Sequence, residues 1–398
     1  MLRLLTRGEA IGFKEPLVAK VVRDFDAEAD RTSRVLLTDS IPTSAESLTL
    51  FCAMVTSASV APDVAASLRL PIVHEADIEH LTQGDVVSIL PNGSVRTLYR
   101  RHSKHNTLFA TERCNSLCLM CSQPPRAVND HWRVDEMLRT IDLADSDTHE
   151  LGISGGEPTL LGEGLLEVVR RCRDRLPNTS LHILSNGRLF RYPALAKAVA
   201  DICHQDLMFG IPLYSDLDDL HDYVVQSRGA FDDTLLGLHN LGRYGVPVEI
   251  RVVVHRATYA RLPQLAEFIY RNLTFASHVA FMGLEATGFA KGNMDSLWID
   301  PWDYQTELEQ ATLFLAARGM RVSVYNHQLC TVPPSIWPYC RQSISDWKNE
   351  YLPLCAQCAA QTACGGFFSF NLKSRLSDHL APIDPERIHV SFGESSRL

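Results

Sequence analysis

Three cysteines close together in the sequence have the spacing of a metal centre. Cys114, Cys118 and Cys121 are spaced C-x3-C-x2-C. A tight loop after a strand can bring three thiolates to one point without a fourth ligand, and thiolate is the ligand that iron–sulfur clusters take. A purely structural metal site would be closed by a fourth ligand. The loop therefore predicts a cluster with one open iron, and the alternative is three small apolar cysteines packed in a loop.

A second group of cysteines lies near the C-terminal end of the chain. Cys330, Cys340, Cys355, Cys358 and Cys364 fall within 35 residues, and the last three have the spacing C-x2-C-x5-C. Without a recognisable secretory signal, such spacing indicates metal ligation rather than disulfides. We therefore expect a second metal centre here, with four-thiolate zinc as the main alternative to iron and sulfur.

Two glycines and a glutamate follow a predicted strand. Gly155, Gly156 and Glu157 come directly after the apolar run 150–154. The glycines would let the backbone approach a ligand closely, and the carboxylate can accept hydrogen bonds from an ammonium group. Gly-Gly-Glu-Pro alone is a common turn, so the motif gains weight only from its place after a strand.

Further polar candidates lie in or after other predicted strands. Ser185 and Asn186 end one strand, where the alternative is an ordinary turn. Arg251 is a charge within an apolar strand, and buried charges are costly unless they are paired. We expect Arg251 either to face a ligand carboxylate or to be neutralised by Glu249 on the same face.

Six units of strand followed by helix must position these residues. Candidate strands are Thr107–Thr111, Glu150–Ser154, Ser180–Leu184, Asp206–Pro212, Pro247–Val254 and His278–Gly283, and candidate helices are Asp135–Asp145, Gly164–Arg175, Tyr192–Ile202, Phe231–Tyr244, Leu262–Asn272 and Trp302–Arg318. This alternation favours an α/β fold with a parallel sheet, closed as a partial (β/α)6 TIM-type barrel. Functional groups of such barrels lie on the loops after the strands. Tyr214 and Glu285 follow strands and are candidates to face a substrate, with plain packing or solvation as the alternative.

Residues 1–105 precede the barrel and are predicted to form a small α/β module. Its clearest element is a hairpin over 84–100, because two alternating runs flank Asn92-Gly93. Short strands are also expected at Val35–Leu37 and Leu48–Phe51, and a short helix at Pro62–Leu68. The module could hold a leader peptide or a partner subunit along a sheet edge, or it could be a structural cap on the barrel.

The composition limits the class of protein. With 398 residues, 45% hydrophobic and 21% charged, the chain is expected to be soluble and globular, with two or three domains. The net charge of -9 argues against a nucleic-acid partner. No stretch approaches the ~20 apolar residues of a membrane span, so we expect a cytoplasmic protein without a membrane partner. Cys52, Cys172 and Cys203 are expected to be buried or incidental.

The first cysteine loop resembles that of the radical S-adenosylmethionine (SAM) superfamily, with Met120 at the apolar position of the C-x3-C-x-Φ-C pattern. The resemblance implies the same partial barrel, a 4Fe–4S cluster on the three cysteines, and SAM on its open iron. It also implies reductive cleavage of SAM to a 5′-deoxyadenosyl radical. The implied SAM contacts are Gly155, Gly156, Glu157, Ser185, Asn186, Arg251 and the backbone at 281–285.

The C-terminal cysteines resemble the SPASM and twitch extensions of peptide-modifying radical SAM enzymes, which carry auxiliary 4Fe–4S clusters. The full SPASM pattern has a further cysteine three residues past the C-x2-C-x5-C run, but Phe368 stands there and no cysteine follows. The resemblance therefore implies one auxiliary cluster in a twitch-like extension. Its implied ligands are Cys355, Cys358 and Cys364, completed by Cys330 or, alternatively, by Cys340.

Longer runs are similar to the C-type radical SAM maturase of the His-Xaa-Ser repeat peptide system. They are residues 115–125, 343–351 and 364–368, and Leu329-Cys330 matches a Leu-Cys pair of that family, which favours Cys330 as the fourth ligand. This resemblance implies a bacterial enzyme that modifies a ribosomally made precursor peptide with His-Xaa-Ser repeats. Its implied partners are a B-type radical SAM maturase and an electron donor such as flavodoxin or ferredoxin.

The predicted domain boundaries follow from these assignments. They are 1–105 for the N-terminal module, 106–320 for the barrel, 321–375 for the auxiliary-cluster extension and 376–398 for a polar tail without a motif. Two other functions stay open: a radical SAM enzyme for a small molecule or nucleotide, as in molybdopterin biosynthesis, and a cluster-bearing subunit that presents the peptide to its partner. The sequence does not determine the bond formed or the residue modified.

Overall fold

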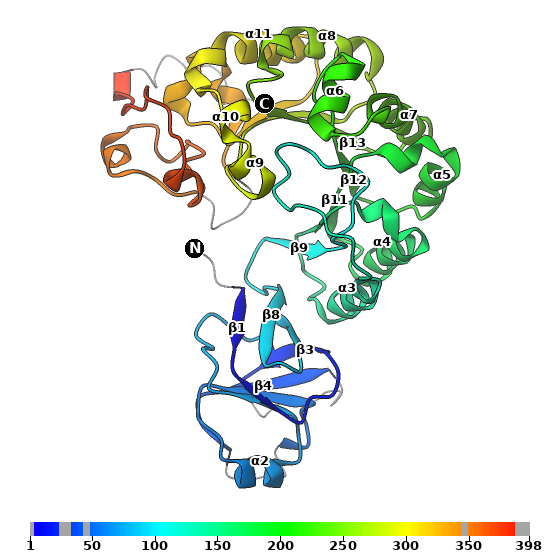
Figure 1. Cartoon of the computed structure of the whole chain (residues 1–398), viewed down its shortest axis with the longest axis vertical. Coiled ribbons are helices and arrows are strands. Elements are labelled where there is room, and N and C mark those ends of the chain that lie inside the picture. The colour runs from blue at the N-terminus through cyan, green and yellow to red at the C-terminus, as the bar shows by residue number, and fades with distance from the viewer. Residues whose placement is uncertain (1–3, 24–32, 43–47, 344–348, 387–398) are drawn as a thin grey trace.

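The protein folds around two sheets of eight strands each (Figure 1), as a computed structural model describes them for residues 4–23, 33–42, 48–343 and 349–386. The first sheet comes from residues before the cysteine loop. The second comes from residues after 104 and is entirely parallel. Part of the run 343–351 and the last part of the tail lie outside the described residues.

The N-terminal sheet is mixed parallel and antiparallel. Its strand order is β1 (Leu5–Arg7), β8 (Ser94–Tyr99), β7 (Val86–Ile89), β3 (Leu17–Val22), β4 (Arg34–Thr38), β5 (Ala53–Thr56), β6 (Ile72–His74) and β2 (Glu9–Ile11). The predicted hairpin is confirmed, because β7 and β8 pair antiparallel on either side of Gly93 at φ +81°. The predicted helix is α2 (Pro62–Leu68).

The strand predicted at Leu48–Phe51 was wrong. The Phe51 N–H donates to the Leu48 carbonyl at 3.1 Å, which makes this segment a turn, and β5 begins only at Ala53. Leu48 and Phe51 are both buried in the small core that includes residues of α2. Their spacing of three residues therefore reflects one side of a turn rather than the alternation of a strand.

The parallel sheet curls into a half-barrel with helices outside it (Figure 1). Its strands in order are β9 (His105–Phe109), β10 (Glu150–Ser154), β11 (Ser180–Leu184), β12 (Leu207–Pro212), β13 (Val248–Val254), β14 (His278–Gly283), β15 (Val322–Tyr325) and β16 (Cys340–Arg341). The helices are α3 (Trp132–Leu143), α4 (Glu163–Arg175), α5 (Pro193–Asp201), α6 (Asp218–Val225), α7 (Ala230–Arg243), α8 (Leu262–Asn272), α9 (Gly288–Gly292), α10 (Met294–Leu297) and α11 (Gln305–Ala316).

All six predicted barrel strands and all six predicted helices are confirmed to within a few residues. Two further strands, β15 and β16, extend the sheet beyond the prediction. They have four and two residues, too few for an alternating pattern to mark them. The predicted partial TIM-type barrel is thus correct in class and larger than predicted.

The core lies between the strands and the outer helices. Leu165, Leu166 and Val169 fall on one face of α4 and pack against the layer that contains Leu151 and Ile153 of β10, and all five are at most 2% exposed. Burial of each such side chain contributes about 1.5–3 kcal/mol. This packing fixes the strands, so the loops at their carboxyl ends are held in place. Among the described residues, no helix is both long and apolar enough to cross a membrane.

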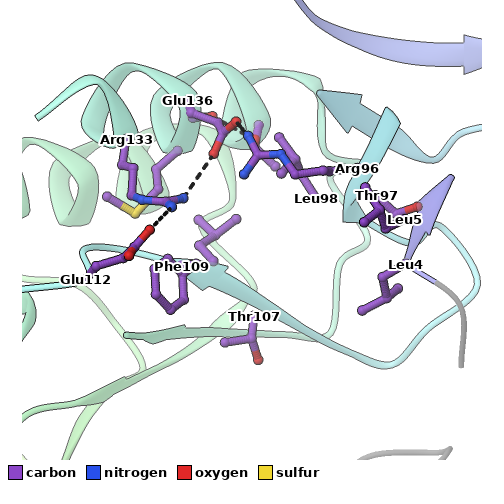
Figure 2. Close-up of a pocket in the computed structure, with 13 residues that line it drawn as sticks. Leu4, Leu5, Arg96, Thr97, Leu98, Thr107, Phe109, Glu112, Arg133 and Glu136 are labelled. Atoms are coloured by element: carbon purple, nitrogen blue, oxygen red, sulfur yellow. Dashed lines mark hydrogen bonds and ion pairs between the residues drawn. The ribbon is translucent and has the colours of Figure 1, made fainter. Parts of the chain in front are cut away.

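The two sheets meet beside β9. Lys20 of β3 forms an ion pair with Asp145 at 2.8 Å, and the Tyr99 hydroxyl lies 2.9 Å from that of Thr148. Next to this junction is a pocket of about 380 Å³, lined by residues of β1, β8, β9 and α3 (Figure 2). The first sheet is therefore attached to the half-barrel through the segment between α3 and β10, next to β9.

Candidate functional site

The first cysteine loop lies at the carboxyl end of β9. Its backbone is held by the end of α6, because Leu117 and Leu119 donate N–H groups to the carbonyls of Val225 and Val224 at 3.1 and 2.9 Å. Met120, at the apolar position of the motif, is 7% exposed. The loop is thus pinned by an element that the sequence analysis did not predict.

The three loop thiols are partly shielded from water. Burial raises the pKa of Cys114 to about 11 and that of Cys118 to about 12, and it also raises the pKa of Cys121. Desolvation disfavours the charged form, so these thiolates need a positive partner such as a metal.

Asp130 fixes the start of the loop. Its carboxylate accepts from the Thr111 hydroxyl at 2.9 Å, from the Glu112 N–H at 2.6 Å and from Arg113 Nε at 3.3 Å. Burial acts to raise the pKa of Asp130, but the hydrogen bonds from Glu112 and Thr111 and the neighbouring arginines outweigh it and lower the pKa. The sequence analysis missed this residue, because its partners are almost 20 positions earlier.

Gly155 and Gly156 lie against the backbone that leads into the cysteine loop. A Cβ on Gly155 would lie 2.6 Å from the Thr111 carbonyl oxygen, and one on Gly156 would lie 2.1 Å from that of Arg113. The Gly156 N–H also donates to the Thr111 carbonyl at 2.7 Å. The glycines therefore permit close approach to the backbone of the cysteine loop, where the sequence analysis expected close approach to a ligand.

Glu157 joins the ends of β10 and β11. Its fully buried carboxylate accepts from the Thr159 N–H at 3.0 Å, from the Ser185 hydroxyl at 2.7 Å and from the Asn186 N–H at 2.6 Å. Burial raises its pKa, although these hydrogen bonds act to lower it. The predicted residues Glu157, Ser185 and Asn186 are thus brought together. Asn186 Nδ2 reaches on to Asn115 Oδ1 at 2.5 Å, within the cysteine loop.

Arg188 is a further residue at this site that the sequence analysis missed. Its guanidinium donates to the Asn115 carbonyl at 2.6 Å, to the hydroxyls of Ser116 and Ser227 at 3.2 and 2.9 Å, and to Asp233 at 3.1 Å. The side chain is 14% exposed. Arg188 therefore ties the cysteine loop to α7, and its position directly after Asn-Gly at the end of a strand was the available signal.

Arg251 pairs with Glu249, which is the second of the two alternatives that we predicted. Its guanidinium lies 3.0 Å from Glu249 Oε1 and 3.1 Å from Met282 Sδ. His182 Nε2 is 3.1 Å from the other oxygen of Glu249. Burial acts to raise the pKa of Glu249, but the His182 hydrogen bond and the Arg251 charge outweigh it and lower the pKa to about 2.

The two residues predicted to face a substrate lie in different surroundings. Tyr214 is 7% exposed and belongs to the apolar cluster that includes Met120, and burial raises its pKa well above the usual value. Glu285 is half-buried and accepts from Asn326 Nδ2 at 3.4 Å. Tyr214 is thus near the cysteine loop, whereas Glu285 contacts the loop after β15.

Four of the five C-terminal cysteines line one pocket. They are Cys330, Cys355, Cys358 and Cys364. Cys340 belongs to β16, is 8% exposed, and is not among the residues that line this pocket. The geometry therefore groups Cys330, rather than Cys340, with the C-x2-C-x5-C run.

Residues 375–383, which we call the C-terminal strap, cover this pocket. The Ile383 N–H donates to Cys358 Sγ at 3.3 Å, and the strap's Leu380, Ala381 and Ile383 complete the pocket lining. The His379 ring stacks on Trp302 at 4.6 Å. The segment predicted as a tail without a motif is therefore part of the second cysteine site.

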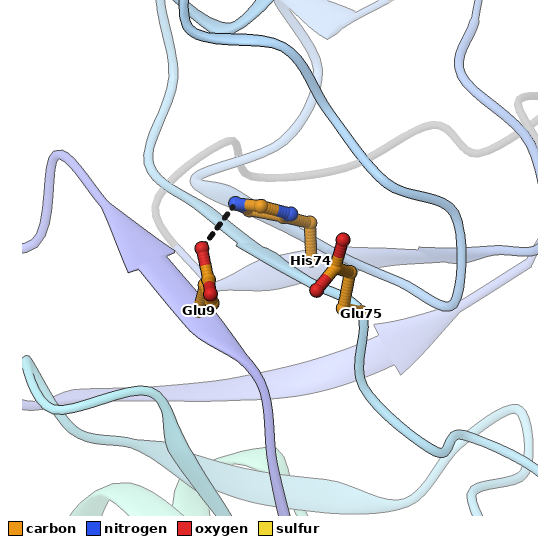
Figure 3. Close-up of side chains that lie close together, drawn as sticks. All are labelled: Glu9, His74 and Glu75. Atoms are coloured by element: carbon orange, nitrogen blue, oxygen red, sulfur yellow. Dashed lines mark ion pairs between the residues drawn. The ribbon is translucent and has the colours of Figure 1, made fainter.

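A separate group of possible metal ligands lies in the N-terminal sheet: Glu9, His74 and Glu75 (Figure 3). Within the described ranges, it is the only group of three or more histidines, cysteines or acids whose ligand atoms all lie within 4.8 Å of one another. However, Glu9 and Glu75 are exposed, and exposed acidic groups are common without a metal. We therefore assign no site here.

Comparison with known proteins agrees with this geometry. Residues 108–269 match the family model described as the Radical SAM superfamily. This part of the chain is therefore similar to radical SAM domains. The family implies a 4Fe–4S cluster and SAM, and the matched residues include the first cysteine loop and the ends of β10 to β13. A search of curated protein sequences found no match.

Solved structures show a similar fold at low sequence identity. Streptococcus suis SuiB bound to S-adenosylmethionine has 15% identity and a TM-score of 0.50 over 72% of this chain and 77% of that chain. Native anSMEcpe with bound AdoMet and Cp18Cys peptide has 16% identity and a TM-score of 0.49 over 72% and 98%. Another SuiB structure gives 16% identity and a TM-score of 0.45 over 57% of this chain, which spans only 50% of that chain.

Proposed function

We propose that the protein is a radical SAM maturase that modifies a ribosomally made peptide. The observation that carries the proposal is the convergence of Glu157, Asn186 and Arg188 on the loop of Cys114, Cys118 and Cys121 at the carboxyl ends of the barrel strands. When bound, the cluster and SAM supply a 5′-deoxyadenosyl radical. The similar structures include SuiB bound to precursor peptide SuiA and anSMEcpe bound to Kp18Cys peptide, which supports a peptide substrate.

The donor set of the first cysteine loop fits an iron–sulfur cluster. Its three thiols are partly shielded from water, and thiolate is the ligand that such clusters take. The loop supplies three thiols and no fourth, whereas a structural zinc site is closed by four ligands.

The surrounding residues of this chain position and shield the reacting groups. Arg188 and Asn186 hold the loop from one side, and Asp130 holds its start. Tyr214 and Met120 are almost inaccessible to water and lie beside the cysteines. Exclusion of water prevents a reactive radical from being quenched by side reactions.

Arg251 and Glu285 are proposed for the substrate side of the site. Arg251 pairs with Glu249, and its guanidinium has further N–H donors, which are proposed to orient the carboxylate of SAM or a carbonyl of the substrate. The remaining proposed SAM contacts are Gly155, Gly156, Glu157 and Ser185, through the ends of β10 and β11.

The second cysteine pocket is proposed to hold one auxiliary 4Fe–4S cluster. Its ligands are Cys330, Cys355, Cys358 and Cys364, and the position of Cys340 outside the pocket supports this choice. An N–H donor at Cys358 Sγ fits a thiolate ligand, since hydrogen bonds to sulfur tune such clusters.

The finer assignment rests on the family resemblance of the sequence. The substrate is then a precursor peptide with His-Xaa-Ser repeats, the partner a B-type radical SAM maturase, and the electron donor flavodoxin or ferredoxin. These components place the reaction in the cytoplasm. The proposed domain division is the N-terminal module, the barrel and the auxiliary-cluster extension, to which the C-terminal strap belongs.

Anaerobic reconstitution with iron and sulfide, followed by SAM and dithionite, tests the proposal. We expect about eight irons per chain, as two four-iron clusters require, and 5′-deoxyadenosine that disappears in Cys118→Ala. With the precursor peptide present, its mass should change. Absence of 5′-deoxyadenosine even with peptide and partner would refute the catalytic role and leave a subunit that presents the peptide.

A further inference from the structure

Strand β9 is the open edge of the half-barrel sheet. It pairs with β10 alone, and the Ala110 N–H that follows it donates to Ser154 on β10 at 2.7 Å. Alternate residues of a strand direct their backbone groups to opposite sides, so those of Thr107 and Phe109 point away from β10. Within the described residues, the N–H and C=O groups of Thr107 and Phe109 have no backbone partner on that side.

The pocket of about 380 Å³ lies along this open edge (Figure 2). The pocket is lined by Leu5 of β1, by Leu4 directly before β1 and by Leu98 of β8. Leu4 and Leu5 are 42% and 54% exposed, which is unusual for large apolar side chains. An open strand edge and an apolar wall thus stand on two sides of one pocket.

The charged side chains of the pocket neutralise one another. Arg96 lies 2.5 Å from Glu136, and Arg133 lies 3.2 Å from Glu112 (Figure 2). Arg133 is also stacked 4.6 Å from the ring centre of Phe109. The walls of the pocket therefore favour a ligand segment without a strong charge. The backbone of such a segment can pair with β9.

We propose that an extended segment of the peptide substrate adds to the half-barrel sheet as a strand beside β9. This inference rests on the proposed function, since it assumes a peptide substrate. Main-chain hydrogen bonds to Thr107 and Phe109 provide affinity, and apolar side chains at alternate positions enter the pocket toward Leu5 and Leu98. The docking edge belongs to the barrel itself and is distinct from the edges of the N-terminal sheet.

The location has a direct consequence for the reaction. The cysteine loop follows β9 after Ala110, so a strand paired with β9 runs along the half-barrel wall toward Cys114. The segment beyond the paired residues is then delivered to the mouth of the barrel. Strand addition thereby limits which residues of a repeat can reach the radical.

Thr107→Pro tests the proposal, because proline removes the outward N–H but leaves the ladder to β10 intact. Thr107→Val is the matched control, since it keeps the N–H and nearly the same shape. We expect the Kd of a labelled synthetic peptide with His-Xaa-Ser repeats to rise about fivefold or more in Thr107→Pro and to stay near the wild-type value in Thr107→Val. Fluorescence anisotropy measures the Kd, and iron content and thermal unfolding report correct folding.

Hydrogen exchange gives a second measurement on the unmodified protein. The amides of Thr107 and Phe109 should exchange more slowly when the peptide is added. Equal Kd values for both variants, or unchanged exchange while the peptide is bound, would overturn strand addition and leave the proposed function intact. A wild-type protein that forms 5′-deoxyadenosine but neither binds nor modifies the peptide would overturn the proposed substrate, and this inference with it.

Discussion

Arg188 should control the stability of the first cysteine loop. Replacement by Met keeps the apolar length of the side chain but removes its contacts to Asn115, Ser116, Ser227 and Asp233. Breaking a buried ion pair by removing one partner costs about 3–5 kcal/mol. Here Asp233 keeps a second partner, Arg191, at 2.6 Å, so the lower end of that range applies.

We therefore expect Arg188→Met to lower the free energy of unfolding by about 3 kcal/mol, which corresponds to a fall in Tm of roughly 4 °C for a chain of this length. The loop carbonyl of Asn115 also loses its charged donor, so the cluster should be lost faster. The two measurements are thermal unfolding of the metal-free protein and the rate at which a chelator bleaches the cluster absorption.

Arg191→Met is the matched control. Arg191 binds the same carboxylate of Asp233, but it is 41% exposed, and its side-chain hydrogen bonds go to Asp233 and Tyr192 rather than to the cysteine loop. Its replacement should leave both the Tm and the rate of cluster loss close to wild type. Equal effects of the two substitutions, or a normal rate of cluster loss in Arg188→Met, would refute the role assigned to Arg188.

Three further predictions follow from the other contacts. The pKa of Glu249 is lowered to about 2, so its pairing stabilises the fold above pH ~4.3 and is lost as the pH falls toward 2. Urea unfolding should show that the loss of stability between pH 7 and pH 3 is about 2 kcal/mol smaller in Glu249→Gln than in the wild type. Cys330→Ser should reduce the iron content from about eight to about four per chain, whereas Cys340→Ser should not, and the reverse result would assign the fourth ligand to Cys340. Trp302→Ala should release the strap at His379, so that a chelator removes auxiliary-cluster iron faster; an unchanged rate would show that the strap does not shield the site.

The regular part of the fold was predictable from the sequence. β10, β11 and β14 begin and end at the predicted residues, because each is a compact apolar run followed by a polar turn. β15 and β16 were missed, because strands of four and two residues leave no periodic signal. The short helix α6, which holds the cysteine loop, was missed for a similar reason.

The sequence indicated the loops of the candidate site better than it indicated the contacts that their residues make. The residue types at 155–157 and 185–186 identified the right loops, but the contacts of Gly155 run to the backbone of Thr111. Asp130 and Arg188 went unrecognised, because their partners lie 17 or more positions away and only the fold brings them together. Sequence patterns report local chemistry, whereas the links between loops depend on tertiary structure.

The C-terminal strap has a consequence for how the protein is made. A chain emerges from the ribosome N-terminus first, so the loop at 114–121 and its clamp Arg188 are available early in synthesis. The pocket of the second cysteine group cannot close until residues 375–383 have emerged, long after Arg188. The two cysteine groups would thus become able to bind metal in a fixed order, the first loop on the growing chain and the second group only later.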